Sequence, residues 1–321
     1  MKQMNKLKPM KASDVKDVDA LAYPLEVLTK YDGVYALVHE GKLLGRSLKP
    51  FKNAYITELL SDSKFDGFVG ELCETQESKS LEREDLCRKT TSCVNTINKE
   101  WEFTWKLFDY IHADVIHLSY TERIEALYKR IGYITSPLEI SVVESTTATC
   151  GADVVDMYEE SLKLGYEGII LRKPNGKWKN GRSTLKEQLL LRMKPQSDAE
   201  AVVVGVVEAM ENNNVAKVNE LGYTERSSHQ ENKVGKGMLG SVLCIDLVSG
   251  KDITVSAGKL THDERVEYFN NPPLHKVVKY RSMTYGVKAA PRFARFYSFR
   301  AVEDLDDKLV VKYYKIIGES K

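Results

Sequence analysis

Two apolar runs flank the tetrapeptide Lys30-Tyr31-Asp32-Gly33, and this arrangement restricts the local fold more than any other stretch of the chain. The run LEVLT precedes Lys30, and the run VYALV follows Gly33 and leads to a second turn signal at Glu40-Gly41. Short apolar runs bounded by Asp-Gly or other glycine-containing turns are typical of β-strands and hairpins. We therefore predict a strand, a turn at Asp32-Gly33 and a β-hairpin, with strands over 25–30, 34–39 and 42–47. Lys30 is expected at a strand end or in the following loop, where its amine can reach a ligand.

The amine of Lys30 can act as a nucleophile only in its neutral form. At the ordinary lysine pKa of about 10.4, roughly one molecule in a thousand is neutral near pH 7.4. Nearby cations and removal from water lower a lysine pKa and free the lone pair. A nucleophilic Lys30 therefore requires a cationic pocket supplied from elsewhere in the chain. The alternative is a solvated lysine that precedes a hairpin turn.

The composition indicates a soluble protein from a reducing compartment. Its 321 residues suffice for one large domain or two of ordinary size. The formal net charge is +1, so a surface for nucleic acid must come from local clustering of cations. The five cysteines lack a C-x-x-C pair, which favours reduced thiols over a disulfide framework or a zinc site. Because no apolar run reaches membrane-spanning length and no secretory signal is visible, we expect an intracellular protein without membrane contact.

The first 197 residues alternate between strand-like and helix-like segments after a polar, basic lead-in over 1–20. The pair Ser119 and Glu122 has capping-box spacing and opens a helix that Gly132 is expected to end. We predict helices over 53–60, 80–93, 119–132 and 152–164. We predict further strands over 65–73, 102–111, 166–174 and 189–195.

The sequence changes character after residue 197. A long β-branched strand over 199–210 is followed by a polar segment over 211–236. The remaining segments are a hairpin over 241–256, a short helix over 262–269, and strands over 277–283 and 293–300. Several short strands with one helix in about 120 residues are typical of a small β-barrel.

Charged residues lie on or beside the predicted strands in an arrangement that suits nucleotidyl transfer. Carboxylates at Asp32, Glu71 and Glu167 can hold Mg²⁺ on phosphate oxygens. Cations can neutralise phosphate charge and lower the pKa of Lys30. These cations are Arg46, Arg192 and Lys194. The ring of Phe108 can stack on a base.

Each of these residues also suits a structural role. Glu71 can be an edge residue of its strand, and Phe108 can belong to the core. Arg192 and Lys194 alternate with apolar residues, which can mark one solvated face of a strand. The residues indicate a nucleotide site only as an ordered set.

The ordered set consists of the motifs KYDG, GRS, GEL, KLFDY, YEGIILRK and LRMKP. In this order and spacing it resembles the ATP-dependent DNA ligases of the covalent nucleotidyltransferase superfamily. The late segment APRFARFYSFR is similar to the last motif of that family, at the end of its OB-fold. The resemblance covers residues 20–305, and the small size is similar to that of the viral and bacteriophage enzymes.

The resemblance implies an α+β fold with two domains. Residues 1–197 are expected to form an adenylation domain of antiparallel sheets with flanking helices, and residues 198–321 an OB-fold β-barrel. The implied cofactors are ATP and Mg²⁺ or Mn²⁺, and the implied partner is nicked duplex DNA. We expect a monomer in a bacterial cytoplasm or a virus-infected host cell.

The resemblance also implies a role for each matched residue. Lys30 forms the lysyl-AMP intermediate, Phe108 stacks on adenine, and Glu71 contacts the ribose or a metal. Glu167 helps to hold a metal, Arg192 and Lys194 face the α-phosphate, and Arg46 meets the AMP or the phosphate at the nick. Arg292, Arg295 and Arg300 orient the leaving pyrophosphate.

The chain departs from the family pattern at four of these motif positions. Tyr35 stands where many relatives have an arginine, and Val69 replaces a common aspartate. Arg172 and Arg192 stand where lysines are usual, and a planar guanidinium fork binds differently from an ammonium.

Two further segments are expected to contact DNA. Eight Lys and Arg residues but one acid, Glu187, lie between Arg172 and Lys194, and Lys177, Lys179 and Arg182 belong to this basic loop. Residues 211–236 are longer than an ordinary hairpin loop, and the resemblance implies a latch around the duplex. A solvated loop is the alternative for 211–236.

Three other functions remain open at this point. An RNA ligase and an mRNA capping guanylyltransferase share the lysine chemistry, although the Arg292–Arg300 ending on a barrel favours a DNA ligase. A non-catalytic single-strand-binding OB protein explains the barrel and the basic loop but leaves Lys30 without a role. The NAD-dependent ligases are disfavoured by the length of the chain and by the lack of a four-cysteine zinc site.

Overall fold

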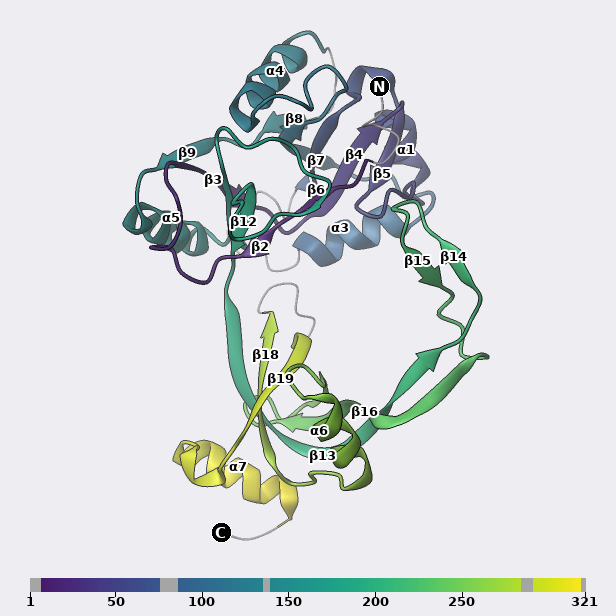
Figure 1. The fold of residues 1–321 in the computed structure, drawn as a ribbon, viewed down its shortest axis with the longest axis vertical. Coiled ribbons are helices and arrows are strands. Elements are labelled where there is room, and N and C mark those ends of the chain that lie inside the picture. Colours follow the sequence, from purple (N-terminus) through teal and green to yellow (C-terminus); the bar gives the residue numbers. More distant parts are fainter. Residues whose placement is uncertain (1–6, 76–85, 135–138, 284–290, 319–321) are drawn as a thin grey trace. The chain divides into compact units, whose positions relative to one another are not determined.

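A computed structural model describes residues 7–75, 86–134, 139–283 and 291–318, with the exception of the side chains of Gln196 and Arg292. The chain divides into two compact units. Unit 1 comprises Met1–Lys194 and Asn219–Tyr223, and unit 2 comprises Pro195–Val218 and Thr224–Lys321 (Figure 1).

The first sheet of unit 1 carries the strand that ends at Lys30. Its strand order is β2-β12-β10-β3-β9. The strands are β2 (Ser13–Asp14), β12 (Leu190–Met193), β10 (Gly168–Arg172), β3 (Leu25–Lys30) and β9 (Ser145–Ala148). All neighbours are antiparallel except β12 and β2, which are parallel. A short parallel pair, β1 (Met10–Lys11) and β11 (Gly181–Arg182), lies outside this sheet.

The second sheet of unit 1 has the order β5-β4-β6-β7-β8. The strands are β5 (Lys42–Gly45), β4 (Val34–His39), β6 (Phe68–Glu74), β7 (Phe103–Tyr110) and β8 (Glu139–Val142). The predicted hairpin is present between β4 and β5, where His39 lies opposite Lys42. Its two turn residues, Glu40 and Gly41, both have positive φ, 51° and 68°, as a two-residue hairpin turn requires.

The segment Asp32-Gly33 does not join two paired strands. β3 pairs with β10 and β9, whereas β4 pairs with β5 and β6, so the chain crosses from one sheet to the other at this point. A Cβ atom on Gly33 would lie 2.2 Å from the carbonyl oxygen of Leu72, so only glycine lets the crossing pass this close to β6. The Asp-Gly pair therefore separates two sheets, a distinction that local turn chemistry does not encode.

Helices cover both sheets of unit 1. They are α1 (Ala54–Leu60), the 3-10 helix η2 (Ser63–Phe65), α3 (Leu86–Asn95), α4 (Tyr120–Gly132) and α5 (Gly151–Lys163). The capping box of Ser119 and Glu122 at the start of α4 is confirmed, and part of the predicted helix over 80–93 lies outside the described residues. Ile56 of α1, Val94 of α3 and Leu127 of α4 pack with Trp105 in the largest core cluster. No helix within the described ranges is long and apolar enough to cross a membrane.

The predicted loose lead-in over 1–20 is wrong for its later part. β1 and β2 lie within it, and Leu7 and Met10 are only 6% and 4% exposed. Parallel pairing with β11 and β12 gives these short strands backbone partners. A strand of two residues has no hydrophobic period, which is why the sequence does not reveal it. Residues 1–6 lie outside the described part of the chain.

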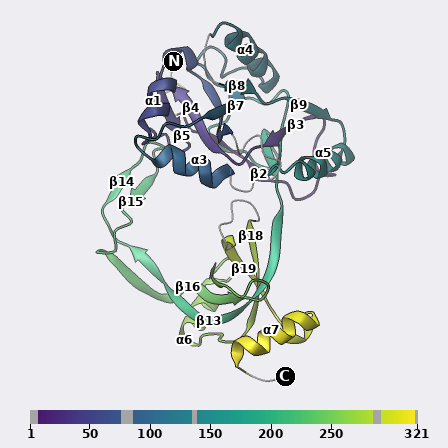
Figure 2. The same cartoon turned by 180° about the vertical axis from the view of Figure 1, so that it is seen from behind.

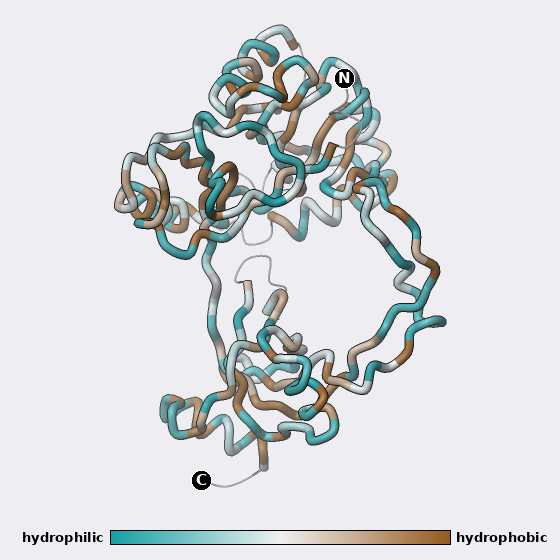
Figure 3. Tube along the Cα trace, in the orientation of Figure 1, coloured by the Kyte–Doolittle hydropathy of each residue, from teal (hydrophilic) through white to brown (hydrophobic). Residues whose placement is uncertain are grey.

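Unit 2 is built on a closed barrel in the order β13-β16-β17-β19-β18. The strands are β13 (Gln196–Asn212), β16 (Lys233–Asp246), β17 (Asp252–Ser256), β19 (Arg292–Arg300) and β18 (Val277–Met283). Along β19, Ala294 and Phe296 are buried in the barrel core, whereas Phe293 and Arg295 are exposed. Apolar residues accordingly recur along the barrel strands (Figure 3).

Three helical segments accompany the barrel: α6 (His262–Asn270), the 3-10 helix η3 (Val302–Asp304) and α7 (Asp307–Ile317) (Figure 2). The helix α6 is predicted from the sequence, whereas α7 is not. Two signals for α7 are present, since Asp306 accepts a hydrogen bond from the backbone N–H of Leu309 and Gly318 ends the helix at φ 77°. Val310 and Tyr313 of α7 pack on Val202 and Val277.

The polar segment 211–236 is an extended hairpin of β-structure. The ends of β13 and β16 pair within it, followed by β14 (Ala216–Val218) and β15 (Thr224–Arg226). Asn214 is 6% exposed, and its side-chain amide donates to the carbonyl oxygens of Ser227 and His229 at 3.1 and 2.8 Å. A buried amide thus fixes the bend between the two strand pairs.

Candidate active site

Three predicted residues meet where β3 ends and β10 begins. The ammonium of Lys30 donates a hydrogen bond to Glu167 Oε2, and the ammonium of Lys194 donates to Glu167 Oε1 at 3.2 Å. The backbone N–H of Glu167 also donates to the carbonyl oxygen of Lys30 at 3.2 Å. The side chains of Lys30, Glu167 and Lys194 are 19%, 8% and 7% exposed. We call these three residues the lysine cluster.

Gly168 makes the lysine cluster possible. Its φ is +140°, and a Cβ atom there would lie 2.1 Å from the carbonyl oxygen of Met193. Only glycine therefore lets β10 approach β12 closely enough for Glu167 to reach Lys194. The same glycine lies directly opposite Lys30 in the sheet.

The lysine cluster carries two ammonium groups for one carboxylate. Burial by itself raises the pKa of Glu167, but the ammonium groups of Lys30 and Lys194 overcome it and lower the pKa of Glu167 below its ordinary value. Burial also lowers the pKa of Lys194, with the charge of Arg192 acting in the same direction. The cluster thus keeps an excess positive charge at a partly accessible position, which favours a bound phosphate.

Glu71 lies on the second sheet, within electrostatic range of Lys30. Burial raises the pKa of Glu71 to about 7, although Lys30 and Arg46 oppose the shift. Glu71 lies directly opposite Tyr35 on one side and Lys106 on the other. Directly opposite residues share one face of a sheet, so these three side chains face the same way. Lys106 is a cation that the sequence analysis missed, although the period-two pattern of its strand places it on the face of Phe108.

Phe108 is the extra residue of a β-bulge. Asp109 lies opposite Val69 and Leu107 lies opposite Gly70, so Phe108 has no partner across the sheet. Its ring packs with Tyr35 at a centroid distance of 6.2 Å and also joins the cluster of Leu28 and Ile170 from the first sheet. Phe108 therefore lies between the two sheets of unit 1. It packs on the face of each sheet that carries the charged residues of the site.

Two departures from the family pattern adjoin each other. Tyr35 and Val69 belong to one apolar cluster on the face of the second sheet. The guanidinium of Arg46, an exposed residue, lies 4.8 Å from the centre of the Tyr35 ring, an arrangement suited to a cation–π contact.

Arg192 is not bound to the lysine cluster. Its guanidinium donates to both carboxylate oxygens of Asp14, at 2.6 and 3.3 Å. The hydrogen bond from Arg192 lowers the pKa of Asp14. The sequence analysis missed Asp14, because it lies in a strand of two residues without a recognisable pattern.

The three predicted metal ligands do not form a preformed metal site. Among the residues that the structure describes, no group of three His, Cys, Asp or Glu side chains is arranged to hold a metal ion, and this includes Asp32, Glu71 and Glu167. Both oxygens of Glu167 already accept hydrogen bonds from ammonium groups. Glu71 has a pKa of about 7 and is partly protonated near neutral pH. These donors do not fit a resident Mg²⁺ as they lie.

The basic loop contains cations in different environments. Lys177 is exposed, whereas Lys179 donates to both oxygens of Glu187 at 2.6 Å. The hydrogen bonds from Lys179, and after them those from Thr184, lower the pKa of Glu187 to about 2. Arg182 donates to the carbonyl oxygen of Ala12 at 2.5 Å. Of these three, Lys177 has the most accessible charge for a phosphate.

The three predicted arginines of unit 2 lie on β19. Arg295 is exposed, and Arg300 pairs with Glu200 at 2.5 Å and donates to the carbonyl oxygen of Asp304 at 2.9 Å. The side chain of Arg292 lies outside the described part of the structure.

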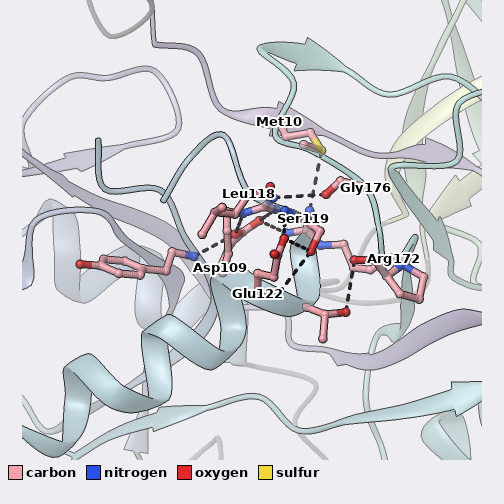
Figure 4. Close-up of polar contacts among 11 residues, drawn as sticks. Met10, Asp109, Leu118, Ser119, Glu122, Arg172 and Gly176 are labelled. Atoms are coloured by element: carbon pink, nitrogen blue, oxygen red, sulfur yellow. Dashed lines mark hydrogen bonds and ion pairs between the residues drawn. The ribbon is translucent and has the colours of Figure 1, made fainter. Parts of the chain in front are cut away.

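Unit 1 also contains a buried ionic cluster. Of its three charged residues, only Arg172 was singled out from the sequence. Asp109 accepts hydrogen bonds from Arg123 and Arg172 with both carboxylate oxygens (Figure 4). We call Asp109, Arg123 and Arg172 the arginine cluster. In the sequence, the only sign of the arginine cluster is the Phe-Asp pair in the KLFDY motif. Arg123 gives no sign, because the other charges of its helix are typical of a solvated face.

Comparisons with known proteins bear on the family and the fold of the chain. The sequence profile of the family described as ATP dependent DNA ligase domain matches residues 9–194. The structure of Chlorella virus DNA ligase-adenylate is 25% identical, with a TM-score of 0.52 over 92% of this chain and 99% of that one. A Lig E DNA ligase structure, 21% identical, shares the fold with a TM-score of 0.65 over 92% of this chain and 98% of that one. A search of curated protein sequences found no match.

Proposed function

Because the chain belongs to the ATP-dependent DNA ligase family, we propose that Lys30 is the residue on which this enzyme forms its adenylate. The protein is an ATP-dependent DNA ligase, which uses ATP to seal nicks in DNA by way of an adenylated intermediate. The observation that carries the assignment of Lys30 is the lysine cluster, in which Glu167 holds the amine beside a second cation, Lys194. This family assignment favours nick sealing over an RNA ligase, a capping guanylyltransferase or a non-catalytic single-strand-binding protein.

The first displacement takes place at Lys30. Its neutral amine attacks the α-phosphorus of ATP, a P–N bond forms, and the bond to the leaving pyrophosphate breaks. The nitrogen gives its proton to water, because the lowered pKa of Glu167 makes that carboxylate a poor acceptor. AMP then passes to the 5′-phosphate at the nick, and the adjacent 3′-hydroxyl displaces AMP. Each step requires in-line positioning and charge neutralisation more than proton transfer.

The remaining residues of unit 1 bind the nucleotide in this proposal. Lys194 neutralises the α-phosphate, and Arg192 joins it after exchanging Asp14 for phosphate oxygens. Phe108 stacks on adenine and Glu71 contacts the ribose. Arg46 binds the AMP or the phosphate at the nick, where its exposed position suits a ligand that arrives from solution.

Mg²⁺ or Mn²⁺ enters with the nucleotide in this proposal. The carboxylates of Asp32, Glu71 and Glu167 lack the grouping of a resident metal site, whereas ATP phosphates carry Mg²⁺ readily. A bound Mg²⁺ would supply charge neutralisation at the phosphates.

We assign unit 1 as the adenylation domain and unit 2 as an OB-fold. The closed order of five strands in unit 2, with α6 between β17 and β18, supports this assignment. The resemblance gives Arg292, Arg295 and Arg300 of β19 the task of orienting pyrophosphate. We expect the enzyme to act as a monomer.

Nicked duplex DNA is the proposed partner. We assign phosphate contacts to Arg46, Lys177, Lys179 and Arg182, and a latch role to the hairpin over 211–236. Phosphate contacts release counterions, so loss of a contact weakens the salt dependence of binding. Shortening the 211–236 hairpin is expected to weaken nicked-duplex binding while self-adenylation continues. Unchanged binding with normal self-adenylation would reject the latch.

The decisive experiment is incubation with ATP or GTP labelled at the α-phosphate, followed by a denaturing gel and a nicked-duplex joining assay. We expect label from ATP on the protein, label lost on addition of pyrophosphate, and joined DNA. Label from GTP alone, or label without joining of nicked DNA, would overturn the proposed function.

A further inference from the structure

The arginine cluster is sealed from solvent. Arg123 donates from Nε to Asp109 Oδ1 at 2.7 Å and from Nη2 to Oδ2 at 3.0 Å, and Arg172 donates from Nη2 to Oδ2 at 2.8 Å. The side chains of Asp109, Arg123 and Arg172 are 0%, 1% and 2% exposed. A substrate therefore has no access to this cluster, and any effect on the reaction must pass through a neighbouring residue.

Further contacts tie the cluster to several elements. Arg123 also donates to the carbonyl oxygens of Leu118 and Gly176, at 2.9 and 3.2 Å. Arg172 lies 4.7 Å from the centre of the Tyr120 ring, and its Nη1 donates to Met10 Sδ at 3.7 Å. Figure 4 shows the polar contacts of the cluster, which bring together Asp109 of β7, Arg172 of β10 and the segments around Met10, Leu118 and Gly176. The carboxylate of Asp109 is the point that connects them.

The cluster adjoins the residue that lacks a partner in the sheet. Phe108 is the bulged residue of β7, so cross-strand pairing does not fix it, and the residues on either side must. Leu107 is fixed by its pairing with Gly70 and by a hydrogen bond from the N–H of Val143 to its carbonyl oxygen at 2.7 Å. Asp109 is fixed by its pairing with Val69 and, at its side chain, by the two guanidinium groups.

A second route leads from the cluster to the same ring. Tyr120, which lies under the guanidinium of Arg172, belongs to the apolar cluster in which Phe108 packs. A shift of Arg172 therefore changes both the chain beside Phe108 and the wall against which Phe108 packs. An arginine suits this task because its planar guanidinium donates to Asp109 from Nη2 and to Met10 from Nη1 while it lies over the ring of Tyr120.

We infer that Asp109, held by Arg123 and Arg172, is a positioning residue that sets the orientation of Phe108 and with it the part of ATP affinity that comes from the base. This rests on the proposed function, in which Phe108 stacks on adenine. The cluster does not act on the phosphates, which meet the lysine cluster on a different part of the sheet. Its loss is thus expected to change recognition of the base selectively.

The test is a double-mutant cycle on the full-length enzyme with Arg172→Lys and Phe108→Leu. Arg172→Lys keeps the charge and loses the planar group that reaches Asp109, Met10 and the Tyr120 ring together, and it avoids the folding risk of removing Asp109. The KM for ATP and kcat are measured in self-adenylation. Inhibition by inorganic tripolyphosphate reports phosphate binding without a base. Arg130→Lys, on the same helix as Arg123 but half-buried and outside the arginine cluster, is the matched control for an Arg→Lys change.

We expect Arg172→Lys to raise the KM for ATP about tenfold, the size of coupling that neighbouring residues show. Inhibition by tripolyphosphate is expected to stay within about twofold of wild type, by the same reasoning on distance between sites. In the Phe108→Leu background the effect of Arg172→Lys on KM is expected to disappear. Asp109→Asn, where it folds, is expected to follow the same pattern, and Arg130→Lys to leave both constants unchanged.

Two results would overturn the inference. One is a multiplicative effect of Arg172→Lys and Phe108→Leu on the KM for ATP, which would show independent action. The other is an equal loss of ATP and tripolyphosphate binding, which a general loss of structure produces. A Phe108→Leu enzyme with wild-type KM would instead reject the stacking role of Phe108, and absence of any ATP-derived label on wild type would reject the proposed function itself.

Discussion

Unit 1 contains two clusters with the same charges and opposite properties. Each places one carboxylate between two cations: Glu167 between Lys30 and Lys194, and Asp109 between Arg123 and Arg172. The lysine cluster is partly accessible, whereas the arginine cluster is sealed. A lysine can lose its proton and exchange its partner, while a guanidinium keeps its charge and its fork geometry. The comparison indicates that the first cluster is built to exchange a carboxylate for phosphate and the second to hold its geometry.

The largest expected effect is that of a substitution that keeps the positive charge of Lys30 and removes its nucleophilic amine. Lys30→Arg is expected to retain an ion pair with Glu167 and to abolish the covalent label from ATP, because a guanidinium is not a nucleophile near neutral pH. Sealing of a pre-adenylated nick is expected to persist. The label is measured on a denaturing gel, with the exposed lysine change Lys186→Ala as control. A labelled Lys30→Arg enzyme would show that another residue carries the AMP.

The second prediction concerns stability in the sealed cluster. Asp109→Ala leaves two buried guanidinium groups without their carboxylate and is expected to lower the free energy of unfolding by about 3–5 kcal/mol. Urea denaturation measures this loss, and Asp114→Ala, at an exposed aspartate five residues along, is the matched control. A change within the range of the control would mean that the arginine cluster contributes little to holding unit 1 together.

The third prediction concerns the effect of a substitution of Glu167 on activity and on stability. Glu167→Gln keeps one accepting oxygen, for either Lys30 or Lys194, and turns an NH2 group toward the other ammonium, so the free energy of unfolding is expected to fall by about 1–3 kcal/mol. Self-adenylation is expected to fall about 100-fold, because the amide no longer supplies the charge that positions the amine. Single-turnover labelling with ATP measures the rate. Wild-type labelling by Glu167→Gln, and by Glu71→Ala measured in parallel, would mark both acids as structural.

The sequence reveals the lysine cluster more fully than the arginine cluster. Lys30, Glu167 and Lys194 each stand beside a glycine, a turn or a strand end, and such local signals survive in a single sequence. The crossing at Asp32-Gly33 could not be predicted, because strand pairing between two sheets depends on residues far along the chain, such as Leu72. Sequence patterns of period two or 3.6 describe one element and not its neighbours.

The arginine cluster has no comparable local signal. Arg123 and Arg172 lie 14 and 63 residues from Asp109, on a helix and a strand whose patterns suit several packings. Each looks like an ordinary surface charge in its own segment. The pairing of Arg192 with Asp14, 178 residues apart, was missed for the same reason. Charge pairs across the fold become visible only when the topology is known.

The fourth prediction uses pH to distinguish a carboxyl group whose pKa is raised by burial from carboxyl groups whose pKa is lowered by neighbouring cations. Burial raises the pKa of Glu71 from 4.5 to about 7, whereas neighbouring cations lower the pKa of Glu167 and of Asp109. The stability that protonated Glu71 contributes is complete below pH 4.5 and is lost as pH rises through about 7. The contributions of Glu167 and Asp109 have the opposite sign and are lost in acid.

Glu71→Gln is the variant that tests this difference. Urea denaturation of the wild type and the variant between about pH 5 and pH 8.5, on either side of the expected transition, isolates the contribution of this one carboxyl. We expect the wild type to lose stability relative to Glu71→Gln as pH rises. A difference between the two proteins that does not change with pH would mean that the pKa of Glu71 is ordinary in the folded state.

The smallest predicted effect concerns an exposed counterpart of the lysine cluster, the pair of Lys179 and Glu187. Both oxygens of Glu187 bind Lys179, whereas Lys177 in the same loop is exposed. Loss of one phosphate contact lowers the log–log salt slope of DNA binding by about one unit. Lys177→Ala is expected to show this full change and Lys179→Ala a smaller one, because Glu187 already neutralises part of the charge of Lys179. Nicked-duplex binding over a salt series measures both, with self-adenylation as the folding control. Equal slopes for the two variants would show that Lys179 exchanges Glu187 for phosphate readily, as Lys30 and Lys194 are expected to exchange Glu167. An unchanged slope for both variants would show that the basic loop does not belong to the DNA surface.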